Sequence, residues 1–184
     1  QARRGCPVDR VFVEFAEPPH VLPEVMEGIA DADIILFAPG SLYTSIIPVL
    51  QVPGIAAAVR QNRKAMKVLV ANLWGQKGET DLVRDEPNRR FYVSDLINAY
   101  QLDIPVGVAD LFREVVVLGL QDIPGNILQS YAFENKVPIY LDRERVTEMG
   151  FYVVETKVFS QRALGERQIV QHDPAALATA IRVL

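Results

Sequence analysis

The sequence predicts an α/β protein with a largely parallel sheet and helices on both of its faces. Short apolar runs rich in Val and Ile alternate with longer segments of helical spacing, as they do in βα units. Runs such as 34–37 and 115–118 are apolar without interruption, which is typical of strands buried on both faces. The 184 residues are 49% hydrophobic and 23% charged, so we expect a single α/β domain over residues 1–184.

Six strands and six connecting helices are predicted from these patterns. The predicted strands, in chain order, are 8–15, 33–37, 67–72, 114–118, 138–141 and 152–159. The predicted helices are 22–30, 55–62, 93–100, 126–135, 143–148 and 174–183. Pro23 occupies a favourable first-turn position, Pro53 and Gly54 precede the second helix, and Asp173 before Pro174 is expected to cap the last one.

Composition argues against several classes of partner. The net charge is −4 and the basic residues are scattered, so we expect no nucleic-acid binding. Arg84, Arg89 and Arg90 are interrupted by acidic residues, so we favour a solvated loop over the alternative of a polyanion site. The single cysteine, Cys6, favours a reducing compartment, and no apolar run approaches the ~20 residues that span a bilayer. We therefore expect a cytoplasmic protein without membrane insertion.

The first candidate binding segment follows the predicted strand at 33–37 directly and leads into a helical pattern. At the carboxyl end of a parallel strand, such a turn presents backbone N–H groups at a helix N-terminus, which favours an anion. Gly40 allows close backbone approach, hydroxyl groups bind phosphate oxygens, and Tyr43 is suited to stacking on a base. The candidate ligand-binding residues are Pro39, Gly40, Ser41, Leu42, Tyr43, Thr44 and Ser45. An equally weighted alternative is that the hydroxyl groups only cap a helix.

The second candidate segment follows the predicted strand at 67–72. Asn72, Gln76 and Thr80 are suited to contacting a sugar or a base edge, and Glu79 or Asp81 to holding a hydroxyl group, a proton or Mg²⁺. Loops that follow neighbouring parallel strands face one crevice, so the two segments are expected to meet. The alternative is an ordinary polar surface turn.

These segments also carry a family resemblance. Residues 33–48, with Gly40, Ser41, Leu42 and Tyr43 at their centre, resemble the YvcK branch of the CofD/YvcK family. The similarity continues through 52–55, 72–73, 76–81 and 94–95. It implies a Rossmann-like three-layer sandwich. The glycine-rich strand-turn-helix with which that family begins has no counterpart in the sequence, so the chain is expected to correspond to the C-terminal part of such a protein.

The resemblance implies a function as well. The YvcK branch is associated with binding a UDP-sugar type of ligand and with a regulatory role in gluconeogenic growth, cell-envelope synthesis and cell shape. One alternative is a CofD-like 2-phospho-L-lactate transferase that requires Mg²⁺, and a second is a non-catalytic assembly subunit. Association into a homo-oligomer is a further implied property. Ala38 and Trp74 depart from the family pattern, which bears on ligand choice.

Overall fold

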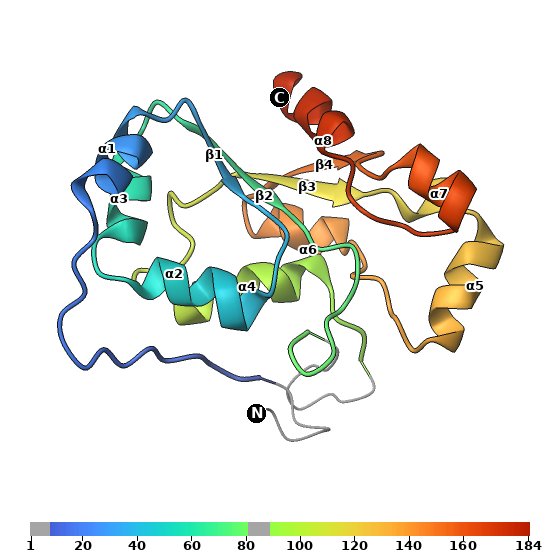
Figure 1. Ribbon diagram of the computed structural model, residues 1–184, viewed down its shortest axis with the longest axis horizontal. Helices are drawn as coiled ribbons and strands as arrows, with labels where there is room; N and C mark the ends of the chain where they lie inside the picture. The colour runs from blue at the N-terminus through green and yellow to red at the C-terminus, as the bar shows by residue number, and fades with distance from the viewer. Residues whose placement is uncertain (1–7, 81–88) are drawn as a thin grey trace.

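The computed structural model describes residues 8–80 and 89–184. Its centre is a sheet of four parallel strands in the order β1-β2-β3-β4 (Figure 1). The strands are β1 (Ile34–Phe37), β2 (Met66–Val70), β3 (Glu114–Leu118) and β4 (Tyr152–Thr156). Because all neighbours pair in parallel, the strands end at the same edge of the sheet, and Phe37 of β1 lies beside Leu69 of β2.

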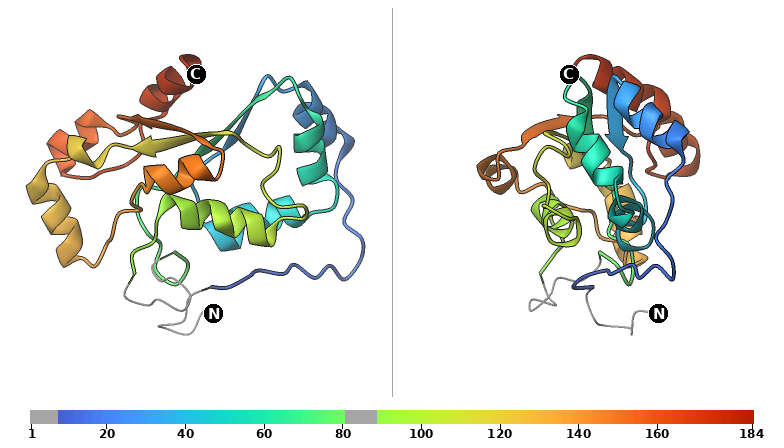
Figure 2. Two further views of the ribbon diagram at one scale, coloured as in Figure 1. Left: turned by 180° about the vertical axis from the view of Figure 1, so that it is seen from behind. Right: turned by 90° about the vertical axis from the view of Figure 1, so that its left-hand side faces the viewer.

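Helices connect the strands and form two layers (Figure 2). They are α1 (Pro23–Asp31), the π-helix η1 (Leu42–Ile46), α2 (Ile47–Gln51), α3 (Ile55–Gln61), α4 (Val93–Asp103), the 3₁₀-helix η2 (Leu120–Asp122), α5 (Gly125–Phe133), α6 (Arg143–Glu148), α7 (Gln161–Arg167) and α8 (Pro174–Arg182). The predicted cap of the last helix is confirmed, because the Asp173 carboxylate accepts hydrogen bonds from the backbone N–H groups of Ala175 and Ala176.

Successive side chains of a strand point to opposite faces of the sheet, so the hydrophobic core is divided between these two faces. Leu69, Val115 and Val117 face a cluster built by α2, α3, α4 and α6. Val68 and Val116 face a second cluster built by α5, α7 and α8. Apolar side chains on both faces explain the uninterrupted apolar runs in the sequence. The predicted Rossmann-like α/β sandwich is confirmed.

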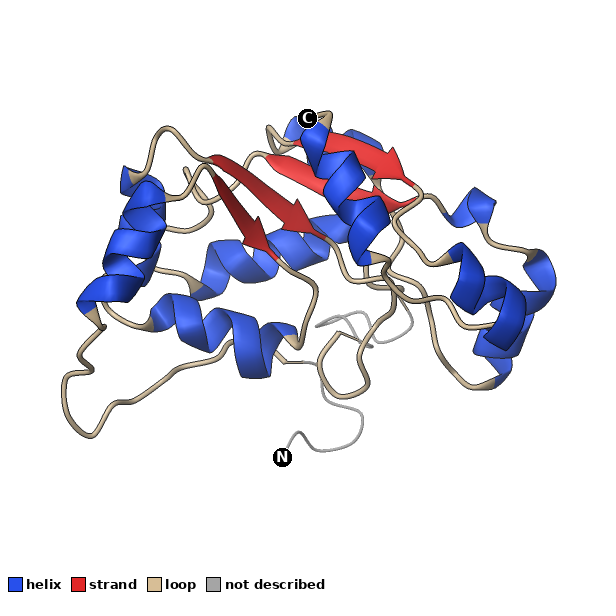
Figure 3. Ribbon diagram, turned by 45° about the horizontal axis from the view of Figure 1, so that its top comes forward, coloured by secondary structure: helices blue, strands red, loops and turns tan. Residues whose placement is uncertain are grey.

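One edge of the sheet is only partly covered. β1 is the outer strand, and Figure 3 shows it at the side of the sheet away from α7. Its inward residue Phe37 is buried, whereas Ile34 and Leu36, which point to the other face, are each 44% exposed. β1 therefore has the composition of an interior strand at an edge position.

Two predicted strands are wrong. Residues 8–15 are extended, but their backbone binds side chains: Val11 N–H donates to Asp103 Oδ1 at 2.7 Å and Val13 N–H donates to Gln51 Oε1 at 3.1 Å. Residues 138–141 form only isolated bridges, Trp74 with Pro138 and Tyr92 with Tyr140. Pro138 has no N–H to donate, so a regular ladder cannot continue through it.

Other boundaries also differ from the prediction. β4 ends at Thr156 rather than at residue 159, and the chain then forms α7, which the sequence did not predict. In the described part of the chain, no single helix combines the length and the hydropathy needed to cross a bilayer. The helical stretches Leu42–Gln51 and Ile55–Gln61, bent by 74° to one another, reach those values only as a pair.

Candidate functional site

The two candidate segments lie side by side, as predicted. β1 ends at Phe37 and β2 at Val70, and the parallel pairing of these strands sends both following loops out of the same edge of the sheet. We call residues 38–45 the first loop and residues 71–80 the second loop. Side chains of the second loop bind the first loop at several points.

Asn72 joins the two loops through both ends of its amide. Its Nδ2 donates to the Gly40 carbonyl at 2.8 Å, and its Oδ1 accepts from Gly40 N–H at 3.2 Å. An amide is suited to this position because it has a donor and an acceptor on adjacent atoms. Asn72 Nδ2 also lies 3.4 Å from Gln76 Oε1, and Gln76 Nε2 donates to Ser41 Oγ at 3.2 Å. The polar side chains thus form one continuous network.

Glu79 occupies the position predicted for a ligand phosphate. Its carboxylate accepts a hydrogen bond from Tyr43 N–H at 3.3 Å and one from Thr44 Oγ1 at 2.8 Å. These donors lie in the first turn of η1, where backbone N–H groups lack partners within the helix. The anion that the first loop binds in this structure is therefore a carboxylate of the protein itself.

Three of the predicted ligand-binding side chains face the interior. Leu42, Tyr43 and Thr80 are 1%, 7% and 1% exposed. Burial raises the pKa of the Tyr43 phenol well above its ordinary value, and the ring packs in the first core cluster, so the predicted stacking on a base is not supported. Thr80 Oγ1 accepts a hydrogen bond from Gln76 N–H at 2.8 Å, which links two residues within the second loop.

The remaining predicted residues are at least partly accessible to solvent. Thr44 and Ser45 are exposed, and intermediate exposure is found for Pro39, Gly40, Ser41, Asn72, Gln76 and Glu79. Asp81 lies outside the described residues. The accessible surface between the loops is therefore made of hydroxyl, amide and carboxylate groups, which suit hydrogen bonding to a polar ligand.

The acidic residues that the structure describes do not assemble a magnesium site. Both oxygens of Glu79 accept hydrogen bonds from the first loop. Asp95 is also engaged, because Oδ1 pairs with Arg89 Nη2 at 2.6 Å and Oδ2 accepts from Tyr92 N–H at 2.8 Å. Across residues 8–80 and 89–184, no three His, Cys, Asp or Glu side chains gather closely enough to hold a metal ion. The described residues thus do not fit a resident Mg²⁺.

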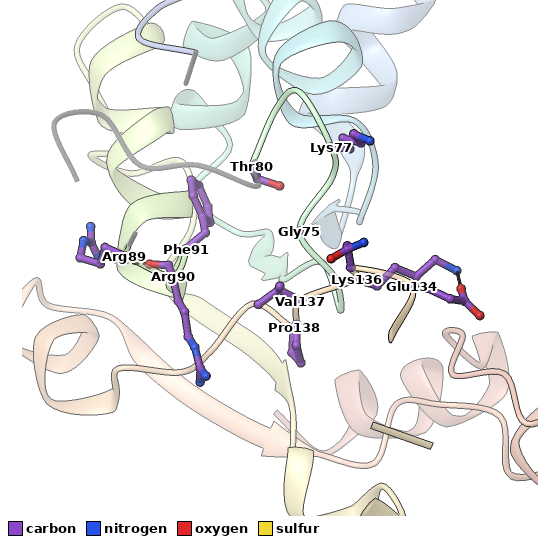
Figure 4. Close-up of a pocket in the computed structure, with 11 residues that line it drawn as sticks. Gly75, Lys77, Thr80, Arg89, Arg90, Phe91, Glu134, Lys136, Val137 and Pro138 are labelled. Carbon is purple, nitrogen blue, oxygen red and sulfur yellow. Dashed lines mark hydrogen bonds and ion pairs between the residues drawn. The ribbon is translucent and has the colours of Figure 1, made fainter. Parts of the chain in front are cut away.

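A pocket of about 580 Å³ opens beside the second loop. Figure 4 shows cationic side chains around Gly75, Val137 and Pro138, where the second loop lies against a distant stretch of the chain. The lining residues are Gly75, Lys77, Thr80, Arg89, Arg90, Phe91, Glu134, Asn135, Lys136, Val137 and Pro138. The sequence interpretation of Arg89 and Arg90 as a solvated loop missed this pocket, since it depends on the distant residues 134–138.

The comparison with protein families decides the affiliation. A family model described as 2-phospho-L-lactate transferase CofD matches residues 1–159. The chain belongs to the CofD family. The resemblance seen in residues 33–48 is thereby confirmed, and it extends over most of the chain.

The curated relatives that this CofD-family chain matches are named gluconeogenesis factors. The chain is 36% identical over 163 residues to a putative gluconeogenesis factor of Nostoc sp., covering 89% of this chain and 32% of the relative. It is 30% identical over 177 residues to the gluconeogenesis factor of Bacillus subtilis, covering 95% of this chain and 50% of the relative. The chain thus spans half or less of the length of these relatives.

Solved structures share the fold of this CofD-family chain. A crystal structure of a UPF0052 family member from Bacillus halodurans has 29% identity and a TM-score of 0.72, covering 88% of this chain and 46% of that chain. A second crystal structure of a protein from Bacillus halodurans has 27% identity and a TM-score of 0.79, covering 97% of this chain and 51% of that chain.

Proposed function

We propose that this CofD-family chain contributes to a binding site for a phosphorylated ligand of the sugar-nucleotide class, with a UDP-sugar as the expected type. The role proposed for this binding is regulatory, in carbon metabolism and in cell-envelope and cell-shape control. The names of the curated relatives, gluconeogenesis factors, support the metabolic part. The observation that carries the proposal is the polar network between the first and second loops at the carboxyl ends of β1 and β2.

The accessible groups of this network suit the neutral part of such a ligand. Ser41 Oγ and the Gln76 amide form the outer end of the network, and the Thr44 and Ser45 hydroxyl groups are exposed beside them. Hydroxyl and amide groups have both donors and acceptors, as do sugar hydroxyl groups and base edges. We therefore propose that Ser41 and Gln76 contact the sugar or the base.

Calorimetric titration of UDP-N-acetylglucosamine into the longest natural polypeptide that contains this sequence tests the proposal. Binding without consumption of the ligand is expected. Ser41→Ala should weaken it by about two- to tenfold, because a hydrogen bond to the ligand contributes roughly 0.5–1.5 kcal/mol. Ser130→Ala on the exposed side of α5 is the matched control and should bind as the unmodified protein does. Unchanged affinity in Ser41→Ala would contradict the assigned contact.

A CofD-like transferase is the second candidate, because the matching family model has that description. Such an enzyme needs acidic groups that converge on Mg²⁺, and Glu79 and Asp95 are instead bound to neighbouring protein groups. Titration with GDP and Mg²⁺ distinguishes the two candidates. Preference for the guanine nucleotide with Mg²⁺ would favour the transferase.

A non-catalytic assembly subunit is the third candidate. The loops satisfy many of their own hydrogen-bonding groups, which a purely structural role would also require. This candidate is favoured if neither nucleotide binds, or if Ser41→Ala and Thr44→Ala leave every affinity unchanged.

A further inference from the structure

The pocket beside the second loop carries an excess of positive charge. Among the described residues that line it, four side chains are cationic, those of Lys77, Arg89, Arg90 and Lys136, and one is a carboxylate, that of Glu134. The excess is local, because the whole chain has a net charge of −4. We propose that this pocket is an anion site that binds phosphate groups, and, given the proposed function, the diphosphate of the sugar nucleotide.

Two of the four cations are already neutralised by protein groups. Arg89 Nη2 lies 2.6 Å from Asp95 Oδ1, and Lys136 Nζ lies 2.7 Å from Glu134 Oε2. In the described part of the chain, Lys77 and Arg90 have no ion-pair partner. The charge available to a ligand is therefore that of Lys77 and Arg90.

The guanidinium group of Arg90 is positioned before any ligand binds. Its Cζ lies 4.6 Å from the centre of the Tyr140 ring, which makes a cation–π contact. A planar guanidinium with several N–H donors matches the geometry of phosphate oxygens. Holding the group in place in advance lowers the entropy cost of binding.

The floor of the pocket is built by backbone pairing. Gly75 N–H donates to the Val137 carbonyl at 2.8 Å, and Ile139 N–H donates to the Leu73 carbonyl at 3.2 Å. A Cβ atom at Gly75 would lie 3.0 Å from the Thr80 carbonyl oxygen, so a side chain at this position would force a change within the second loop itself. The stacked rings of Trp74 and Tyr131, with centroids 4.2 Å apart, support the same segment.

The first loop is less suited to a phosphate than this pocket. Its donors in the first turn of η1 already bind the Glu79 carboxylate, and a second anion there would be repelled by it. The second loop separates the two places: Glu79 binds the first loop, whereas Gly75, Lys77 and Thr80 line the pocket. A volume of about 580 Å³ falls in the range of small-molecule sites. The phosphate groups are thus assigned to the pocket and the neutral part to the loops.

Calorimetric titration of inorganic pyrophosphate at low ionic strength, into the longest natural polypeptide that contains the sequence, tests this assignment. The double variant Lys77→Gln, Arg90→Gln should weaken binding at least tenfold. The double variant Arg63→Gln, Lys64→Gln removes two cations at the opposite end of the sheet and is the matched control, with affinity expected within twofold of the unmodified protein. Should the first double variant fail to fold, the single change Lys77→Glu at an exposed position serves, and it should weaken binding by a similar factor.

The outcomes separate this inference from the proposed function. Pyrophosphate affinity that depends on Ser41 and Thr44 but not on Lys77 and Arg90 overturns the pocket and leaves the sugar-nucleotide proposal standing. Absence of pyrophosphate binding, in a protein that binds the sugar nucleotide, overturns the pocket as well. Pyrophosphate binding that requires Lys77 and Arg90, without any sugar-nucleotide binding, supports the pocket and contradicts the proposed function.

Discussion

At the scale of single residues, the candidate site is held together by side chains of the second loop that hydrogen-bond to backbone groups of the first loop. Asn72 donates to and accepts from the backbone of Gly40, and Glu79 binds Tyr43 N–H. The sequence predicted these positions, because polar residues directly after apolar strands stand out in the pattern. It could not predict that they bind one another, since each bond joins residues more than 30 positions apart in the chain.

Changing Asn72 to aspartate should destabilise the fold. Asn72→Asp keeps an acceptor for Gly40 N–H but removes the donor to the Gly40 carbonyl, so we expect the free energy of unfolding to fall by about 1–3 kcal/mol. Urea denaturation at pH 7 measures the change. Gln129→Glu, the same amide-to-carboxylate change at an exposed position of α5, is the control and should stay within about 0.5 kcal/mol. Equal stabilities of the two variants would mean that the Asn72 bond is not important for the fold.

Asp103 should make the stability depend on pH. Burial raises the pKa of its carboxyl group, and the bond from Val11 N–H opposes this only in part. The folded state then keeps a proton at pH values where the unfolded chain has lost it, so the free energy of unfolding decreases as the pH rises from about 4 through the folded pKa. Asp103→Asn should flatten this decrease in denaturation curves measured from pH 4 to pH 7. An unchanged slope in the variant would assign the dependence to other groups.

At the scale of elements, the wrong prediction of a strand at residues 8–15 has a clear physical origin. Residues 8–15 have the composition of a strand, yet their backbone binds the side chains of Gln51 and Asp103. Propensity shows that a segment is extended, but only the fold determines what pairs with it. The four strands that form the sheet were predicted because their apolar runs are long and bounded by turns, and local pattern is sufficient for such strands.

Gln51 should hold the extended segment 8–15 against the core. Its Nε2 donates to the carbonyls of Val11 at 2.6 Å and of Asp103 at 2.9 Å, while its Oε1 accepts from Val13 N–H. We expect Gln51→Ala to increase the hydrogen-exchange rate at Val13 by about tenfold or more, since its amide loses its partner. Gln61→Ala in α3 is the control, and its exchange at Val13 should match the unmodified chain. Slow exchange at Val13 in Gln51→Ala would show that other contacts hold the segment.

At the scale of the whole molecule, the sequence and the fold agree because parallel βα units have a regular pattern. The predicted sheet with helices on both faces matches the two core clusters that flank β2 and β3. The pocket of Lys77 and Arg90 could not be predicted, because it forms where the second loop meets residues 134–138 and only the tertiary structure brings them together.

The half-covered β1 has a consequence for the chain when it is produced by itself. Edge strands of soluble proteins commonly carry Lys, Pro or a bulge that blocks further pairing, and the sequence Ile34, Ile35, Leu36, Phe37 has none of these. β1 is therefore a template for strand addition, and intermolecular β-pairing should make the chain self-associate as its concentration rises. Sedimentation velocity should show this association reduced in Ile34→Lys and Leu36→Lys but retained in Val25→Lys, an equally exposed position on α1. Association that all three substitutions leave unchanged would mean that the molecules meet through another face.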